Sequence, residues 1–152
     1  MNKATQLVLF ALDEQRYALR LTAVERIVRA VEVTPLPKAP QIVQGVIDVQ
    51  GRVIPAVDVR QRFRLPEREV ELGDQFIIAH TGRRTVALAV DAVTGVVECA
   101  AGEVRAAEEI LPGMEYIEGV LRLEDGMALI HDLDRFLSLD EETALDQALG
   151  QA

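Results

Sequence analysis

Residues 45–63 read GVIDVQGRVIPAVDVRQRF, and this stretch decides the fold. Two runs rich in β-branched residues, Val46–Val49 and Val53–Val59, flank the short polar segment Gln50-Gly51-Arg52. β-Branched residues favour strands, and a glycine at the tip between two such runs is typical of a hairpin. Proline cannot donate a backbone hydrogen bond, so Pro55 is expected at a sheet edge or a bulge. The stretch predicts an antiparallel hairpin.

The segments on either side continue the strand pattern. Before the hairpin, an apolar run, an alternating segment and a β-branched segment fill residues 7–12, 17–22 and 27–33. Pro35, Pro37 and Pro40 then predict a stiff connecting loop, because proline interrupts a regular ladder. Similar runs follow at residues 76–80, 85–90, 96–100, 119–123 and 127–133. The sequence therefore predicts an all-β chain with five strands in each half.

The two halves repeat one another. Residues 19–28 align with residues 88–97 at a constant offset of 69, and residues 45–59 align with residues 119–133 at an offset of 74. Matched glycine and aspartate positions, such as Gly45 with Gly119 and Asp58 with Asp132, carry more weight than matched apolar ones. A repeat of this length predicts two copies of one five-stranded unit inside one globule rather than a solenoid.

Helices are expected to be minor. Thr22 and Glu25 have capping-box spacing, which predicts a single turn between two strands. Ser138 and Glu141 repeat that spacing before a tail in which Leu145 and Leu149 share one face. A helix over about ten residues is marginal in isolation, so this one is expected to dock on the core.

Charge and composition limit the kinds of partner. The net charge is −9, and most of the acidic excess lies in the second half, which argues against nucleic acid and suits either a basic protein patch or simple solubility. The single cysteine, Cys99, fits a reducing compartment. The apolar run near the start is far shorter than the ~20 residues that span a bilayer, so we expect a cytoplasmic protein with no direct membrane insertion.

Reactive side chains are too few for an enzyme. The histidines are His80 and His131, the only serine is Ser138, and no cysteine pair or histidine spacing suggests a metal site. Surface or satisfied-core positions are expected for both histidines, and a core position for Cys99. We therefore predict no catalytic residues, no cofactor and no metal.

Four arginines follow the hairpin with Phe63 among them: Arg60, Arg62, Arg64 and Arg68. Such a group could bind nucleic acid through charge and stacking. Glu67, Glu69 and Glu71 follow at once and cancel the positive field. A solvated loop between the two halves is the preferred interpretation.

The hairpin stretch resembles the hallmark segment of the CheW-like family, usually G-V-I-N-L-R-G-x-V-I-P-V-I-D-L-R-x-R-F. Three further segments agree, at residues 17–27, 33–37 and 90–96, and the ending from Tyr116 to Asp134 looks like the close of the family. The resemblance covers about residues 5–138. It implies a single domain of two intertwined five-stranded barrels resembling SH3 domains, at about 7–68 and 74–138, with a helix at about 138–149.

The resemblance also implies partners. Family members couple the cytoplasmic tips of methyl-accepting chemoreceptors to the regulatory domain of the histidine kinase CheA, and kinase and coupling protein can assemble into rings. By analogy, Val24, Arg26 and Val28 are expected to face the kinase. A groove between the barrels is expected to receive receptor helices, with its residues drawn from the hairpin and from the region around residue 90: Gly45, Asp48, Gln50, Gly51, Val90 and Val93.

Two positions depart from the family pattern. The family's N-x-R-G becomes Asp48-Val49-Gln50-Gly51, and the usually acidic position of Arg26 is basic. Glutamine cannot replace arginine in a bidentate contact. These departures leave open a second hypothesis, in which the chain assembles or localises a signalling complex outside chemotaxis. A third hypothesis, a small β-barrel ligand-binding protein or enzyme, requires an internal cavity that the many Leu, Val and Ile residues disfavour.

Overall fold

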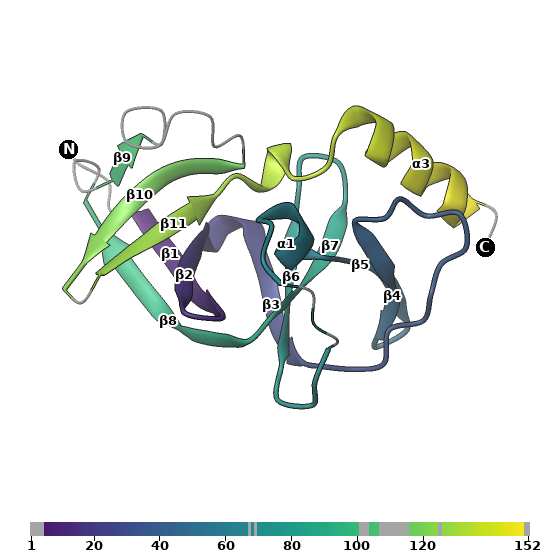
Figure 1. Ribbon diagram of the computed structural model, residues 1–152, viewed down its shortest axis with the longest axis horizontal. Coiled ribbons are helices and arrows are strands. Elements are labelled where there is room, and N and C mark those ends of the chain that lie inside the picture. The colour runs from purple at the N-terminus through teal and green to yellow at the C-terminus, as the bar shows by residue number, and fades with distance from the viewer. Residues whose placement is uncertain are drawn as a thin grey trace.

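The structure is a computed structural model that describes residues 5–66, 68, 70–100, 104–106, 116–124 and 126–150. Within these residues the chain forms two β-sheets joined side by side, with one long helix at the end of the chain (Figure 1). The all-β prediction with SH3-like sheets and a short C-terminal helix is confirmed.

The two sheets contain six and five strands, respectively. The six-stranded sheet has the order β8 (Ala92–Cys99), β1 (Thr5–Leu12), β2 (Gln15–Arg20), β11 (Gly126–His131), β10 (Ile117–Leu123), β9 (Val104–Ala106). The five-stranded sheet has the order β3 (Val24–Arg29), β6 (Gln75–His80), β7 (Thr85–Val90), β5 (Arg52–Val57), β4 (Val43–Val49). The short strand β9 falls inside a segment that the sequence pattern assigned to a connection.

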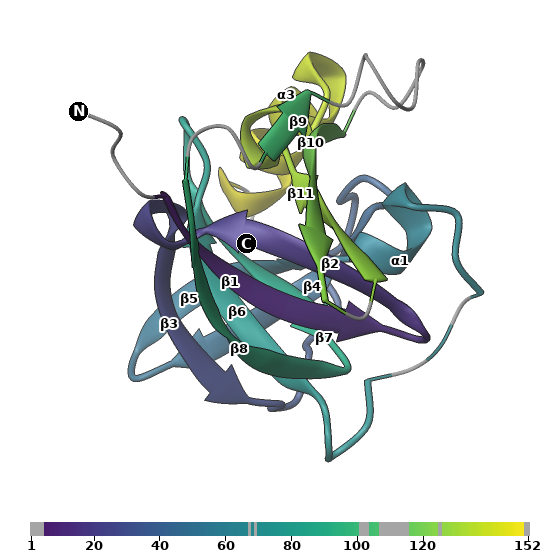
Figure 2. The same cartoon turned by 90° about the vertical axis from the view of Figure 1, so that its left-hand side faces the viewer.

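Each sheet takes strands from both halves of the sequence. Strands β1 and β2 pair with β8 and β11, while β6 and β7 join β3, β4 and β5. Figure 2 shows purple β1 beside green β8, although they lie far apart in the chain. The two halves are therefore intertwined, as the resemblance implies, and the barrel bounds at about 7–68 and 74–138 stay a prediction. Strand signals from the two halves are alike, so the sequence pattern could not show which strands are exchanged.

The strand registers reproduce the internal repeat. In β4 and β5, Val43 pairs with Val57 and a bulge precedes Gly45; in β10 and β11, Ile117 pairs with His131 and a bulge precedes Gly119. Parallel pairs recur in the same way, with Ala56 opposite Ala87 and Ile130 opposite Ala18. The backbone N–H groups of Asp58 and Asp132 each donate over 2.7 Å, to the carbonyls of Ile42 and Tyr116. Residues separated by 69 or 74 positions in the sequence thus occupy equivalent places in the two sheets.

The hallmark hairpin closes with a two-residue turn. Val49 pairs with Arg52, so the turn is Gln50-Gly51, and Arg52 already belongs to β5. Both turn residues have positive φ, +51° and +87°, which is the type I′ geometry that matches strand twist. Gly51 donates its N–H to Oδ1 of Asp48 over 2.8 Å and fixes the turn.

Pro55 lies in an interior strand, which corrects the expectation of an edge or a bulge. Its partner on β4, Val46, uses both of its backbone groups in 2.8 Å hydrogen bonds to Thr34 on the far side. Val46 therefore needs no donor from Pro55. On the other side, parallel pairing with β7 begins only at Ala56. The missing N–H thus falls at a position where no ladder bond is required.

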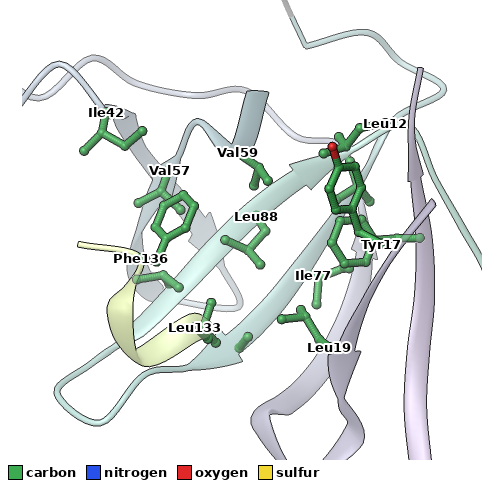
Figure 3. Packing of buried hydrophobic residues seen from close by; sticks show 14 of the residues in the cluster. Leu12, Tyr17, Leu19, Ile42, Val57, Val59, Ile77, Leu88, Leu133 and Phe136 are labelled. Atoms are coloured by element: carbon green, nitrogen blue, oxygen red, sulfur yellow. The ribbon is translucent and has the colours of Figure 1, made fainter. Parts of the chain in front are cut away.

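One apolar core joins the two sheets. Leu12, Tyr17 and Leu19 from the six-stranded sheet pack with Ile77 and Leu88 from the five-stranded sheet (Figure 3). Fully burying such a side chain stabilises the fold by about 1.5–3 kcal/mol before entropy is counted. Two smaller clusters fill the sheets separately, one around Leu7 and Ile130 and one around Ile47 and Phe76. The shared core is what holds the exchanged strands in place.

Helix α3 (Leu139–Gly150) is capped as predicted. Ser138 donates its N–H to Oε1 of Glu141 over 2.8 Å, and Glu141 returns its N–H to Oγ of Ser138 over 3.1 Å. Leu145 is buried and Leu149 packs against the shared core. Arg84 adds an ion pair to the buried Glu142 at 2.9 Å. The helix is thus bound to the five-stranded sheet.

Candidate interaction surface

The candidate site lies where edge strand β3 meets the β4–β5 turn. A bulge between Val24 and Arg26 shifts the register of β3 against β6, and Glu25 and Arg26 are both exposed. Nη1 of Arg26 donates to Oε1 of Gln50 over 3.1 Å. The structure therefore joins a residue predicted to face the kinase with one predicted to line the receptor groove. The two departures from the family pattern contact each other.

A second set of polar contacts lies beside this pair. Nη1 of Arg52 donates to both carboxylate oxygens of Glu25, over 2.8 and 3.0 Å. Nη2 of Arg52 reaches Oγ1 of Thr85 at 3.4 Å, and that hydroxyl lies 3.0 Å from Nδ1 of His80. The pairs link β3, β5, β6 and β7 at one end of the five-stranded sheet. We call Glu25, Arg26, Ile27, Arg52 and Val53 the β3 surface; Gln50, which contacts it through Arg26, belongs to the β4–β5 turn.

Apolar side chains accompany these charges. Ile27 is 39% exposed and Val53 is 65% exposed. By contrast, Val24 and Val28 are half-buried and pack against two different core clusters. Of the three residues predicted to face the kinase, Arg26 is the one with an exposed side chain. Ile27, between the predicted positions, was missed, because β-strand alternation places it on the face opposite to Arg26.

The predicted groove residues are not gathered in one place. Asp48, Gln50 and Gly51 form the turn before β5, whereas Val90 lies beyond the end of the β5–β7 pairing, which stops at Val57 and Leu88. Val90 is buried, and Val93 packs against the core while its N–H donates to Oε1 of Gln75 over 2.7 Å.

Gly45 also has a packing role. A Cβ at this position would lie 2.2 Å from the carbonyl oxygen of Thr34, and φ is +153°. Only glycine allows Thr34 to approach β4 this closely. The glycine of the hallmark is therefore explained by the contact with the chain after β3.

Two of the four arginines after the hairpin, Arg60 and Arg68, are held in ion pairs rather than solvated, which corrects the sequence-based interpretation for them, whereas Arg64 is exposed. Arg60 lies in the short helix α1 (Val59–Arg62), is buried, and donates to Asp13 over 3.0 Å and to Asp91 over 2.6 Å. Arg68 binds Asp74 and Asp91. Burial alone would raise the pKa of Asp91, but hydrogen bonds led by that from Arg60 hold it below its usual value. These ion pairs tie α1 to both sheets.

His131 is buried but not satisfied. Within the part of the chain that the structure describes, neither ring nitrogen has a hydrogen-bond partner. The ring packs edge-on against Phe63 and Phe136, with centroids 5.0 and 4.9 Å away. Burial, with the nearby charge of Arg62, lowers the pKa of His131 to about 3. The expectation of a surface or satisfied-core position holds for exposed His80 and is wrong for His131.

Other chemical features are sparse over the described residues. They include no group of three or more His, Cys, Asp or Glu side chains placed to hold a metal ion. None of the helices described is both long and apolar enough to traverse a lipid bilayer. Cys99 is buried, as expected for a small core residue. The fold and its exposed surface define an all-β domain whose candidate site is a surface suited to another protein.

Comparison with known proteins gives the family. A family model described as the CheW-like domain matches residues 6–141. The chemotaxis protein CheW of Rhizobium meliloti (strain 1021) is 30% identical over 145 residues, which cover 94% of this chain and 94% of that protein. The chemotaxis protein CheW of Treponema pallidum (strain Nichols) is 29% identical over 142 residues, covering 90% and 84%. The crystal structure of the scaffolding protein TtCheW from Thermoanaerobacter tengcongensis superposes with a TM-score of 0.82 at 25% identity, covering 91% and 96%. The chain belongs to the CheW-like family.

Proposed function

We propose that this protein is a non-catalytic adaptor that couples chemoreceptor tips to the regulatory domain of a CheA-type histidine kinase. Its relatives bear the name chemotaxis protein CheW, and one related structure is described as a scaffolding protein. The carrying observation is the β3 surface, where Arg26 bonds to Gln50 beside exposed Ile27 and Val53. Exposed apolar residues beside charged groups suit a protein interface, because the former supply affinity and the latter orientation.

Binding of a kinase regulatory domain tests this proposal. The Arg26→Glu variant reverses a charge on the β3 surface without touching the core, and the Ile27→Asp variant removes its apolar contact. We expect each to weaken binding at least about tenfold in calorimetry. Arg122→Glu, at an exposed position of β10, and Leu139→Asp, at a 72% exposed position of α3, are the matched controls. Unchanged binding by both test variants, with melting curves like wild type, would refute the assignment of this surface.

The contact with the receptor is proposed at the β4–β5 turn, because Asp48, Gln50 and Gly51 are exposed there. Gln50→Ala removes the side-chain amide that accepts from Arg26 and truncates the side chain that the turn exposes. The hydrogen bond from Gly51 N–H to Asp48, which holds the turn, is retained. Co-sedimentation with a receptor cytoplasmic fragment measures the effect. Loss of receptor binding with kinase binding retained supports a separate receptor contact. We also propose that the protein forms rings with the kinase or with further copies of itself. Electron microscopy of the same mixtures tests whether such rings form.

One observation favours the alternative, a complex outside chemotaxis. At the β3 surface Arg26 is paired with a neutral amide rather than a carboxylate, so its positive charge is not neutralised by Gln50. A partner selected for an acidic residue at this position would meet repulsion. If no chemotaxis kinase binds while another CheW-like kinase domain does, the alternative replaces the first proposal.

A further inference from the structure

A groove lies on the five-stranded sheet, and none of the residues that line it was assigned to the kinase or the receptor. It has a volume of about 670 Å³ and lies between the chain after β3, residues 30–33, and the chain before β6, residues 70–72. Protein pockets that hold ligands typically measure about 300–1,000 Å³. The groove is therefore large enough for a pair of side chains from another molecule.

Most of the residues that line the groove are apolar, and two of these apolar side chains are exposed to water. Leu72 is 95% exposed and Val31 is 41% exposed. Val33 and Val70, also in the lining, pack against the buried cluster beneath the groove. The floor is thus held by the core, while the rim carries apolar side chains that gain from burial. Covering a side chain such as Leu72 is favourable by about 1.5–3 kcal/mol.

The charged groups that line the groove are both carboxylates. Glu32 and Glu71 contribute carboxylates, and Glu32 forms no ion pair among the residues that the structure describes. Arg68 lies 3.3 Å from Glu71, but it is shared with Asp74 and Asp91. The rim is consequently acidic on balance.

Gln44 adds an unpaired acceptor. Its Oε1 is buried and has no hydrogen-bond partner within the described part of the chain. The internal repeat shows what is missing, because the equivalent residue at an offset of 74 is Glu118, which accepts from Arg20 over 2.6 Å. The position equivalent to Arg20, at an offset of 69, is Ala89. Among the residues that the structure describes, none donates to Gln44 Oε1 at the place where the other sheet has a guanidinium.

We infer that this groove is a docking site for a protein segment that places an apolar side chain against Leu72 and Val31 beside a lysine or arginine. The basic group faces Glu32 and Glu71 and provides a donor near Gln44. A second copy of this chain fits less well, because its own groove is acidic and its net charge is −9. The inference goes beyond the coupling function, since it adds a surface that the proposed kinase and receptor contacts do not use.

A pair of synthetic peptides tests the inference on the full chain labelled with ¹⁵N. The first is a capped ten-residue peptide with three leucines and two lysines, and its twin carries two glutamates in place of the lysines. We expect the lysine peptide to shift the amide signals of residues 30–33, 44 and 70–72 in a saturable manner, and the glutamate peptide to bind at least about fivefold more weakly. Added salt should narrow this difference, because it screens exposed charges.

Two single-residue variants test whether the peptide binds in this groove. Leu72→Asp should weaken binding of the lysine peptide at least about tenfold, since it removes the apolar contact. Leu139→Asp alters a similarly exposed leucine on α3 and should leave the affinity unchanged. Kinase binding by Leu72→Asp should equal that of wild type, which separates this site from the β3 surface. Equal binding of the two peptides, signal shifts elsewhere, no binding at millimolar concentration, or an unaffected Leu72→Asp variant would each overturn the inference.

Discussion

Nη2 of Arg60 donates to Oδ1 of Asp91 over 2.6 Å and thereby joins helix α1 to the junction of β7 with β8. The guanidinium also binds Asp13 in the β1–β2 turn. Three segments that belong to different parts of the sequence meet at this one side chain. Because Arg60 is buried, its removal leaves Asp13 without this guanidinium and Asp91 with Arg68 as its remaining arginine partner in this group.

The first prediction concerns this ion pair. Arg60→Met keeps most of the apolar stem and removes the charge, so the free energy of unfolding should fall by about 2 kcal/mol, measured by urea denaturation. Arg20→Met breaks the half-exposed pair with Glu118 and should cost less than about 1 kcal/mol. Equal losses from the two variants would contradict a special role for the buried arginine.

The second prediction concerns acid stability. The pKa of His131 is lowered to about 3 in the fold, whereas an unfolded histidine titrates near 6.5. Between these values the unfolded state binds the additional proton, so stability is present above about pH 6.5 and is lost as the pH falls toward 3. His131→Phe removes the titrating group and retains the packing with Phe63 and Phe136.

Urea denaturation at pH 7.5 and pH 5 checks this prediction. Wild type should lose about 2 kcal/mol more than His131→Phe over that interval, since one proton contributes about 1.4 kcal/mol per pH unit below 6.5. His80→Gln, at an exposed position, should behave like wild type. If His131→Phe and wild type lose the same stability, the ring is not buried in its neutral form.

The third prediction separates steric contact from backbone conformation. Gly45→Ala would place a Cβ 2.2 Å from the carbonyl oxygen of Thr34, whereas Gly95 has the same φ of +153° and no neighbour within 4 Å. We expect Gly45→Ala to destabilise the fold by at least about 2 kcal/mol more than Gly95→Ala in thermal or urea denaturation. Similar losses would mean that the conformation alone, rather than the contact with Thr34, requires glycine.

The fourth prediction tests the capping of α3. Ser138→Ala removes the side-chain acceptor for the N–H of Glu141 and should lower the free energy of unfolding by about 1 kcal/mol. Thr143→Ala, at an exposed position inside the same helix, should be neutral or slightly stabilising, because alanine has the higher helix propensity. A neutral Ser138→Ala variant would show that docking rather than capping maintains the helix.

Local patterns were sufficient for most of the strands, for the C-terminal helix and for the repeat, but they did not predict the short strand β9 or helix α1. The hairpin around Gln50 and Gly51 and the capping box of Ser138 depend on residues close together in sequence, so spacing reveals them. The offsets of 69 and 74 also survive in the registers of the sheets.

Long-range partners could not be inferred in this way. The carboxylates that pair with Arg60 lie 47 and 31 residues away in the sequence. The sequence near Arg60 is rich in acidic residues after residue 66, and nothing in it distinguishes Arg60 from a solvated arginine. His131 was similarly ambiguous, because both faces of β11 are covered near its end: Ile130 is buried in the cluster around Leu7, and Leu129 packs against the shared core. Strand alternation does not identify a solvent face on such a strand.

The same limit applies to the candidate site. Sequence similarity selected Arg26 and Gln50, and the contact between them required the fold. It also selected Gly45 and Val90, whose burial and packing are visible only once the neighbouring segments are in place.

The exchange of strands has a consequence for how the molecule comes apart. Neither half of the sequence contains a complete sheet, so a cut in the connection between the halves would leave two fragments with unpaired strand edges. We expect such fragments to regain structure only by complementing each other, and the intact chain to unfold in one cooperative step. A tension applied to the two ends would then load both sheets at once, because β1 belongs to the six-stranded sheet and α3 is bound to the five-stranded one.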